Sequence, residues 1–332
     1  MRIGLIGLGR IGAFHARTLM ALPQVDELLV TDALSSVAGA VANEVGATVV
    51  GDPEELFDSR VDGVVIASST PTHADLVRAS VSRGLPTFCE KPVAQPAGNA
   101  VALREELSGS GVPVQVGFPR RFDAAYRTAR DQAQSGALGY LHTVRSTTLD
   151  PAPPPSEYVA ASGGIFHDCA IHDFDSVRWA TGQDVVDVMA VGANQGVDYI
   201  EAAGDVESAT TLLTLTGGTI AVVSNARTNG RGYDVRLELL GSKDSVSAGM
   251  DERLPLRSAD PAVRFPSGRP WGFFMDRFAE AFRAELAAFT EVVTGTRPSP
   301  CTLHDGVEAT LVAEAATRSL RERRRVLLDE VR

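Results

Sequence analysis

The sequence predicts an α/β protein of two domains: an N-terminal doubly wound parallel sheet and a C-terminal α+β domain with a large, mainly antiparallel open sheet. The chain has 332 residues, enough for two domains of about 100–200 residues. Its first 120 residues alternate short apolar runs with longer amphipathic stretches. After Arg121 the runs instead alternate apolar and polar residues. We therefore expect domains at residues 1–120 and 121–332.

The strands of the first domain are expected to be buried on both faces, because they are short and nearly continuous in apolar residues. The candidate strands are Ile3–Ile6, Leu28–Thr31, Val61–Ala67, Pro86–Cys89 and Val112–Val116. The candidate helices between them are Ile11–Met20, Ser35–Glu44, His73–Arg83 and Ala97–Leu107. Strands that alternate with helices predict right-handed crossovers and a parallel sheet.

The second domain begins with a proline-rich loop, Pro151–Pro155, and continues with strands of alternating polarity. These strands are Ser208–Leu215, Thr219–Ser224 and Val235–Leu240. Gly217 and Gly218 predict a hairpin turn between the first two. Two long helices then close the chain, the second from about Asp305 to Arg321. The first carries a stripe that we expect to face the core, formed by Phe274, Phe278, Phe282 and Leu286.

Composition excludes several classes of protein. A net charge of −11 disfavours a nucleic-acid partner. No run approaches the roughly 18 apolar residues of a membrane span, and the first apolar run is too short for a signal peptide. We therefore expect a cytoplasmic protein without a membrane partner. Cys89, Cys169 and Cys301 are far apart and lack Cys-x-x-Cys spacing, which favours buried free thiols over a disulfide or a zinc site.

A glycine motif connects the first strand to the first helix. Its residues are Gly7, Leu8, Gly9, Arg10, Ile11 and Gly12. In this pattern the first glycine permits a tight turn, the second lets a pyrophosphate approach the backbone, and the third lets helix and strand pack closely. We therefore predict a dinucleotide-binding Rossmann domain, with the anion on the N–H groups at the helix start. Arg10 and Ile11 are candidate cofactor-binding residues together with the glycines.

Asp32 follows the second strand, 20 residues after Gly12. A carboxylate there can accept hydrogen bonds from the ribose hydroxyls and would repel a 2′-phosphate. No arginine follows among residues 33–36 to neutralise one. The sequence therefore favours NAD over NADP. The alternative is that Asp32 only ends a strand or caps a helix.

A second set of polar residues carries the chemistry of proton transfer. Lys91 follows the fourth strand within Glu90-Lys91-Pro92, where it could donate to a substrate hydroxyl or be a solvated loop lysine. Asp168 and His172 are four residues apart and would share one face of a helix. The histidine could accept a proton from an alcohol, oriented by the aspartate. A metal site and a purely structural helix start remain as alternatives.

These motifs resemble the Gfo/Idh/MocA oxidoreductases over essentially the whole chain, and most of all the inositol 2-dehydrogenases. The resemblance also rests on further segments in family order, namely Pro71-Thr72-His73, residues 117–123 and Tyr233-Asp234-Val235-Arg236. It implies that Lys91, Asp168 and His172 form a catalytic set. It implies further cofactor-site residues at Ser68, Ser69, Thr70, His73 and Glu90, candidate pocket residues at Arg121 and Tyr233, and dimers or tetramers formed through the C-terminal sheet.

The implied reaction is NAD-dependent oxidation of a secondary hydroxyl of a cyclic polyol, bound in the crevice between the domains. Pro119 and Leu149 depart from the residues expected in many relatives and leave the exact polyol open. Three alternatives stand beside this hypothesis. They are a sugar dehydrogenase on the same scaffold, acting on an aldose or a nucleotide-linked sugar, a non-catalytic NAD-binding regulatory protein, and a metal-dependent isomerase using His167, Asp168 and His172.

Overall fold

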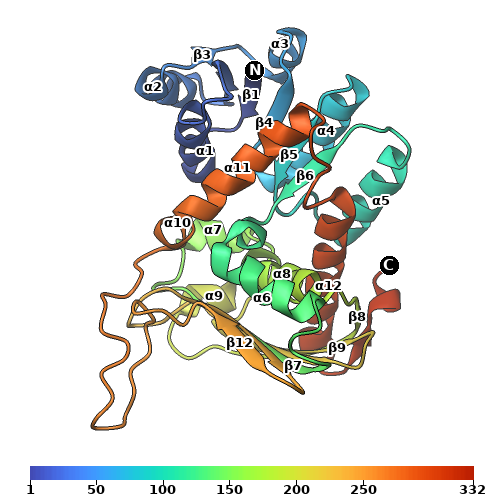
Figure 1. Cartoon of the computed structure of the whole chain (residues 1–332). Helices are drawn as coiled ribbons and strands as arrows, with labels where there is room; N and C mark the ends of the chain where they lie inside the picture. The colour runs from blue at the N-terminus through green and yellow to red at the C-terminus, as the bar shows by residue number, and fades with distance from the viewer. The chain divides into compact units, whose positions relative to one another are not determined.

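The computed structural model describes all residues, Met1–Arg332, and the chain divides into two units (Figure 1). Unit 1 comprises Met1–Phe122 and Glu280–Val307, and unit 2 comprises Asp123–Ala279 and Glu308–Arg332. The sequence analysis divided the chain into two consecutive segments, whereas each unit in the structure consists of two separate segments. The returning segment Glu280–Val307 joins unit 1 because its apolar side chains lie in the core of that unit.

Unit 1 contains a six-stranded sheet in which every neighbouring pair is parallel, in the order β3-β2-β1-β4-β5-β6. This is the doubly wound order that the sequence predicted. The elements are β1 (Arg2–Ile6), α1 (Arg10–Met20), β2 (Glu27–Thr31), α2 (Ser35–Val45), β3 (Thr48–Val49), α3 (Pro53–Asp58), β4 (Gly63–Ile66), α4 (Thr70–Ser82), β5 (Thr87–Glu90), α5 (Ala97–Leu107), β6 (Val114–Gly117), η1 (Pro119–Phe122) and α11 (Ala279–Val293). Only the short elements β3, α3 and η1 were missing from the prediction.

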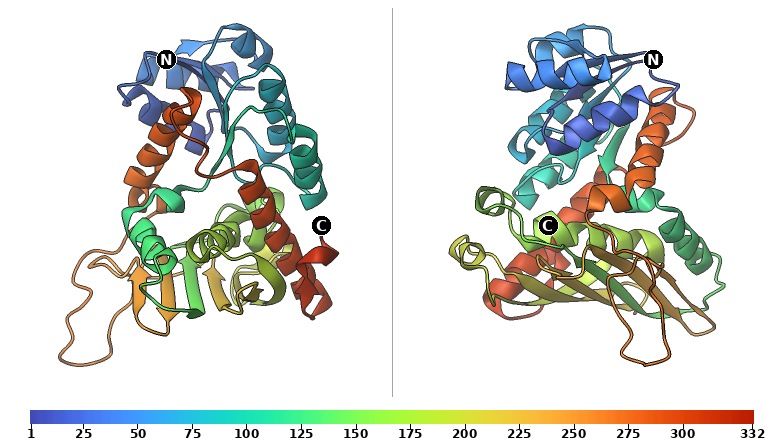
Figure 2. Two further views of the ribbon diagram at one scale, coloured as in Figure 1. Left: turned by 45° about the vertical axis from the view of Figure 1, so that its right-hand side comes forward. Right: turned by 90° about the vertical axis from the view of Figure 1, so that its left-hand side faces the viewer.

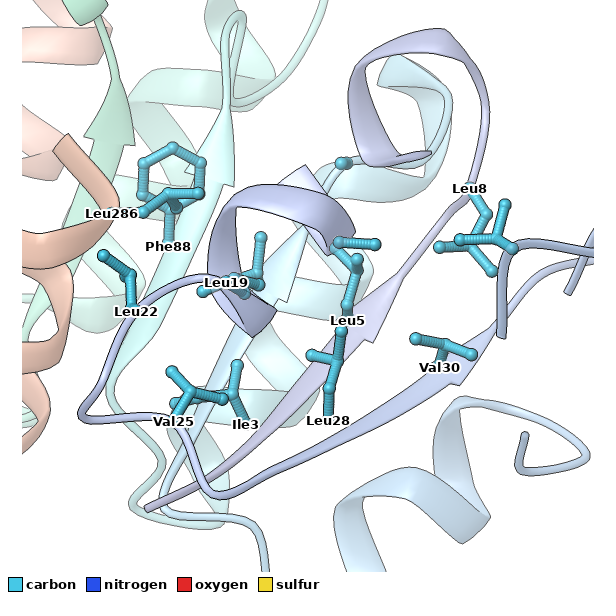
Figure 3. Packing of buried hydrophobic residues seen from close by; sticks show 14 of the residues in the cluster. Ile3, Leu5, Leu8, Leu19, Leu22, Val25, Leu28, Val30, Phe88 and Leu286 are labelled. Carbon is cyan, nitrogen blue, oxygen red and sulfur yellow. The ribbon is translucent and has the colours of Figure 1, made fainter. Parts of the chain in front are cut away.

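The core of unit 1 explains why these runs form buried strands. Ile3 and Leu5 of β1 are fully buried, and they pack with residues of α1, β2 and β5 (Figure 3). Leu286 of α11 belongs to the same cluster and is also fully buried. Burial of each such side chain stabilises the fold by about 1.5–3 kcal/mol. The parallel sheet therefore depends on a helix contributed from near the C-terminus.

Unit 2 contains a seven-stranded sheet in the order β12-β11-β7-β10-β9-β8-β13. Only β7 and β10 pair in parallel, so the prediction of a mainly antiparallel sheet is confirmed. The predicted hairpin joins β9 to β10. The elements are α6 (Ala124–Gln134), β7 (Leu141–Leu149), α7 (Ser156–Ala161), η2 (Phe166–Ala170), α8 (Ile171–Thr181), β8 (Val185–Ala193), α9 (Asp198–Ala202), β9 (Ser208–Leu215), β10 (Ile220–Ala226), β11 (Asp234–Gly241), β12 (Ser245–Ala248), α10 (Phe274–Arg277), α12 (Leu303–Glu322), β13 (Val326–Leu327) and η3 (Leu328–Glu330).

The helices α6, α8 and α12 cover one face of this sheet, and its other face carries no helix (Figure 1, Figure 2). The strands alternate accordingly. In β9 the residues Ala209, Thr211 and Leu213 are buried, whereas Leu212 between them is 46 % exposed. A long irregular segment between β12 and α10 extends away from the sheet of unit 2 (Figure 2).

The aromatic stripe near the C-terminus differs from the prediction of one continuous helix. The helix breaks at Phe278, between α10 and α11. Phe278 packs against Tyr126 and Tyr233 in unit 2, and Phe282 packs against Phe14 in unit 1. The fourfold spacing thus identified three buried side chains, Phe278, Phe282 and Leu286. Phe274 is only partly buried, and the stripe packs into the cores of both units instead of one.

All three cysteines are buried and free, as the sequence predicted. Burial raises the pKa of the Cys89 and Cys169 thiols well above their usual range, and neighbouring carboxylates add to the effect. In the whole chain, we find no helix whose length and apolar character would let it cross a membrane.

Candidate active site

The candidate cofactor residues of unit 1 lie at one edge of its sheet. Gly7 follows β1, Asp32 follows β2, Ser68 follows β4 and Lys91 follows β5. These four strands are parallel, so their carboxyl ends meet at the same edge. In doubly wound sheets ligands bind at this edge, where the strand order reverses, here between β1 and β4.

Two glycines of the turn are sterically required, and the third leaves space over the backbone. Gly7 has a φ of +90°, and a Cβ there would lie 2.4 Å from the backbone of Ser68. A Cβ on Gly12 would lie 1.9 Å from the carbonyl oxygen of Gly7. Gly9 by contrast has nothing within 4 Å of the place where its Cβ would be. Gly7 and Gly12 therefore build the turn, and Gly9 leaves open space over the backbone.

The first turn of α1 suits an anion. Gly9 is the N-cap and provides no side-chain oxygen to the first N–H groups, and no acidic residue lies in this turn. Helix N-termini carry a partial positive charge and unpaired N–H donors. The open space at Gly9 is where a diphosphate would reach them. These residues fit the pyrophosphate of a dinucleotide.

Asp32 is held by the backbone at both oxygens. Its Oδ2 accepts from the N–H of Leu8 at 2.7 Å, and its Oδ1 accepts from the N–H of Leu34 at 2.9 Å. Leu34 is the N-cap residue of α2. The bond to Leu34 closes an Asx turn in front of α2 and is not a side-chain cap of that helix. It also fixes the carboxylate beside the glycine turn, where a partly exposed acceptor can meet a ribose.

His73 links the turn after β4 to the loop after β5. Its Nδ1 lies 2.8 Å from the carbonyl oxygen of Pro92, and its Nε2 lies 3.0 Å from that of Ser68. The ring is buried. Ser68 also bonds Thr72 through the two hydroxyls at 2.7 Å, and Ser69 is the N-cap of α4, with Thr70 as its first residue. In this arrangement His73 connects the segment that carries Lys91 to the β4–α4 turn.

Glu90 and Lys91 differ in their surroundings. The Glu90 Oε1 lies 2.7 Å from Nε2 of the fully buried His15, on α1. Lys91 is half-buried and comes directly after β5. The buried His15–Glu90 pair thus anchors the strand end immediately before the candidate catalytic lysine. Sequence analysis did not single out His15, which shows no signal beyond its place in the first helix.

Asp168 and His172 lie in unit 2, at the start of α8. The sequence analysis expected one regular helix here. The structure instead has a π-helical turn, η2, over Phe166–Ala170, followed by α8 from Ile171. Asp168 is on the π turn and His172 in the first turn of α8. Short π-helical turns occur often at functional sites, because they shift side chains out of the regular helical spacing.

Sequence analysis missed the main charged partner of Asp168. Arg227, fully buried directly after β10, forms an ion pair with Asp168 at 3.1 Å. The Tyr158 hydroxyl donates to the other oxygen of Asp168 at 2.7 Å. Neither contact joins neighbouring residues in the sequence, so periodicity and motif spacing could not reveal them. The one available signal is a cation placed three residues after the predicted strand Thr219–Ser224.

Arg121 and Tyr233 are both buried, and each contacts residues of its own unit. Arg121 forms an ion pair with Asp305 at 3.1 Å and donates to the carbonyl oxygen of Pro300 at 3.1 Å. Tyr233 is buried and packs against Phe278. These contacts give both residues structural roles, and their assignment to a substrate pocket stays a prediction.

The proposed metal set does not assemble in the structure. No group of three or more His, Cys, Asp or Glu side chains lies close enough together to hold a metal ion. His167 is buried and faces Glu314 of α12 at 3.5 Å. The pairing with His167 lowers the pKa of Glu314. The donor geometry therefore does not support a metal-dependent isomerase.

Comparison with known proteins identifies the family. Residues 1–118 match a model of an oxidoreductase family with an NAD-binding Rossmann fold, and residues 126–247 match the model of the GFO/IDH/MocA C-terminal domain. The chain belongs to the Gfo/Idh/MocA oxidoreductase family. The resemblance inferred from the sequence motifs is thereby confirmed, and so is the NAD-binding Rossmann domain.

Individual Gfo/Idh/MocA members match over their full length. The chain is 36 % identical to a protein named myo-inositol 2-dehydrogenase from Thermotoga maritima, covering 100 % of this chain and 99 % of that one. It is 35 % identical to an inositol 2-dehydrogenase from Rhizobium meliloti, over 98 % of both chains. A scyllo-inositol dehydrogenase from Lactobacillus casei, solved with NAD(H) and scyllo-inositol, superposes with a TM-score of 0.89 at 28 % identity over 99 % of both chains.

Proposed function

We propose that this chain is an inositol 2-dehydrogenase-like enzyme that oxidises a secondary hydroxyl of a cyclic polyol with NAD. The observation that carries the proposal is the match, over 99 % of both chains, to a structure solved with NAD(H) and scyllo-inositol. The open space at the glycine turn and the fixed carboxylate of Asp32 support the part of the proposal that concerns NAD binding. Lys91, Asp168 and His172 supply the groups that alcohol oxidation requires.

In the proposed mechanism each of the three residues has one task. His172 accepts the proton of the reacting hydroxyl as general base. Asp168 orients the imidazole and stabilises its charged form. Lys91 donates a hydrogen bond to the reacting oxygen and stabilises the negative charge that develops on it. NAD, when bound, supplies the hydride acceptor, and the protein supplies placement and charge.

The cofactor preference follows from Asp32 and its neighbours. Its carboxylate is held in place by two N–H groups and would repel a 2′-phosphate. Residues 33–36 contain no arginine or lysine that could neutralise that phosphate. We therefore expect NAD to be used in preference to NADP.

A panel of substrates tests the proposal. The purified enzyme is assayed with inositol isomers, aldoses and nucleotide-linked sugars, each with NAD⁺ and with NADP⁺, by absorbance of the reduced cofactor. We expect an inositol with NAD⁺ to give the highest kcat/KM. A higher value for an aldose or a nucleotide-linked sugar would make the chain a sugar dehydrogenase instead. Binding of NADH without turnover of any compound would favour a regulatory protein.

We also propose that the bare face of the unit 2 sheet forms an interface between copies of the chain, as dimers or tetramers. Leu212 and Ile220, on the adjacent strands β9 and β10, are 46 % and 52 % exposed on this face, and Val191 of β8 is 56 % exposed. Side chains of this kind favour association. Light scattering coupled to gel filtration should give an oligomer for the native chain and a smaller species for Leu212→Glu. A monomeric native chain would contradict this proposal.

A cytoplasmic location is proposed as well. The proposed dependence on NAD and the three free, buried thiols are consistent with a reducing compartment. Fractionation of cells that produce the protein, with detection by antibody, tests this directly.

A further inference from the structure

A buried cluster of charges lies behind Asp168. The Arg227 side chain has no exposed surface. Its Nη1 lies 3.1 Å from Oδ2 of Asp168, and its Nη2 and Nε lie 3.0 Å and 3.3 Å from Oδ2 of Asp205. One guanidinium thus joins two carboxylates from different parts of unit 2. Burying a cation costs free energy of desolvation unless the cation is paired with an anion. The burial of Arg227 between two carboxylates therefore needs a structural or functional reason.

The cluster is tied to the backbone at several points. Arg227 comes directly after β10, and its N–H donates to the carbonyl oxygen of Glu207 at 2.8 Å. Asp205 accepts from the N–H of Ile165 at 2.9 Å through its other oxygen. Ile165 is the residue immediately before the π turn that carries Asp168. The arginine and its second carboxylate therefore fix both the side chain of Asp168 and the start of its segment.

The two oxygens of Asp168 face different surroundings. Oδ2 points to the fully buried Arg227, and Oδ1 accepts from the hydroxyl of Tyr158 at 2.7 Å. Tyr158 lies on α7, just after the proline-rich loop, and is 44 % exposed. One oxygen is thus held by a buried cation, and the other by the hydroxyl of a partly exposed tyrosine.

The charges favour an ionised Asp168. Burial opposes the charge of Arg227, but the attraction of Asp168 and Asp205 outweighs it and raises the pKa of the guanidinium. Arginine stays protonated in proteins, and its planar fork fixes the direction of each hydrogen bond. A permanent cation at 3.1 Å keeps a carboxylate in its charged form and limits its rotation.

We infer that Arg227 is the positioning residue for Asp168 in the dehydrogenation reaction. It acts through Asp168 and need not touch the substrate. By holding Oδ2 it leaves Oδ1 at a fixed point, as an acceptor for the imidazole of His172 or for a substrate hydroxyl. This inference rests on the proposed function, since it assigns Arg227 a part in that reaction. A misplacement of about 1 Å at such a group can lower the rate about a hundredfold.

A purely structural role for Arg227 makes a different prediction. An ion pair that only stabilised the fold would change the fraction of active enzyme without changing the rate of the active molecules. The rate constant of the first turnover separates the two roles, because it does not depend on how much enzyme is active. The amplitude of that turnover measures the active fraction.

The experiment compares Arg227→Lys and Arg227→Met with wild type, as whole-chain enzymes. NADH formation in the first turnover is followed by stopped flow with the polyol that wild type oxidises fastest. NADH affinity and thermal unfolding are measured on the same samples. We expect the first-turnover rate constant to fall about tenfold or more for Arg227→Lys, which keeps the charge but loses the fork. For Arg227→Met we expect a fall of about a hundredfold. NADH affinity should remain within about twofold of wild type.

Arg178→Lys serves as the matched control. It removes the fork of another buried arginine of unit 2, which pairs with Asp184 at 2.6 Å, and it leaves the Arg227 cluster intact, so its first-turnover rate constant should stay within about threefold of wild type. A wild-type rate constant in Arg227→Lys, whatever the amplitude, would overturn the inference. If Arg227→Met does not fold, the lysine variant still decides. If wild type oxidises none of the polyols or sugars, the proposed function fails and the inference fails with it. If wild type is active and Arg227→Lys is unaffected, only the inference fails.

Discussion

Oδ2 of Asp32 accepts a hydrogen bond from the main-chain N–H of Leu8 at 2.7 Å. Leu8 lies within the glycine turn, and Asp32 directly follows the neighbouring strand β2. The residue proposed to select the cofactor and the turn proposed to receive its diphosphate are therefore joined by a hydrogen bond. A change at either position should affect both.

Replacing Asp32 should change the choice of cofactor. For Asp32→Ala we expect kcat/KM with NAD⁺ to fall about tenfold or more, since charge-assisted hydrogen bonds contribute about 1.5–3 kcal/mol. The value for NADP⁺ should fall less or rise, because the repulsive carboxylate is gone. Steady-state kinetics with both cofactors check this. Asp75→Ala, at an exposed position on α4, is the control. An unchanged ratio between the cofactors would remove Asp32 from cofactor selection.

His172→Ala should lower turnover at least about a hundredfold, because general-base assistance is worth roughly 10²–10⁴ in rate. NADH affinity should change little, as the proposed role concerns only the substrate proton. The exposed His142 on β7 provides a matched control through His142→Ala. Turnover is measured by NADH absorbance and affinity by NADH fluorescence. Near-normal turnover in His172→Ala would exclude it as the base.

Tyr158→Phe removes only the hydroxyl that donates to Oδ1 of Asp168. A hydrogen bond to a charged group contributes about 1.5–3 kcal/mol, so we expect kcat/KM for the polyol to fall about tenfold or more. The control is Tyr140→Phe, whose ring is 75 % exposed. Equal kinetics for the two variants would show that the Tyr158 contact does not matter to the reaction.

Asp305 should make stability depend on pH. Burial opposes its charge, but Arg121 and Thr302 outweigh that effect and lower its pKa. A lowered pKa in the folded state contributes stability that is present above the unfolded value of about 4. That contribution is lost as pH falls through the folded value. Asp305→Asn should therefore lower the free energy of unfolding by about 2 kcal/mol at neutral pH, and by less at about pH 3.

Urea unfolding at the two pH values measures the effect of Asp305→Asn. Asp329 is 94 % exposed and lies 3.4 Å from Arg332, so Asp329→Asn is a surface control that should leave stability unchanged at both pH values. An equal loss of stability for Asp305→Asn at neutral and acidic pH would show that its charge is not involved.

The thiols should be unreactive in the folded enzyme. All three cysteines are buried, and burial raises the pKa of Cys89 and Cys169 well above that of a free thiol. Only the thiolate reacts quickly with alkylating and disulfide reagents. A thiol titration should therefore detect none of them in the native state and three after denaturation. Rapid labelling of the native protein would contradict the burial of these side chains.

The sequence predicted those features that depend on neighbouring residues. The glycine turn and Asp32 were found because their chemistry lies within one βαβ unit. The hairpin at Gly217 was found because turn residues act locally. Arg227 was missed because its partner Asp168 is 59 residues away. A stripe of phenylalanines indicates that one face of a helix is buried, but it does not indicate which unit that face packs against. The break in the helix at Phe278 was therefore missed too.

The return of the chain to unit 1 has a consequence for biosynthesis. Leu286, Phe289 and Val292 of α11 belong to the apolar cluster built by the first strands. The ribosome makes these three residues long after the last strand of that sheet. The core of the cofactor-binding unit therefore stays incomplete and partly exposed to solvent until the intervening 157 residues of unit 2, positions 123–279, have been synthesised. A gene fragment ending near residue 122 should yield an aggregating polypeptide, not a minimal nucleotide-binding module.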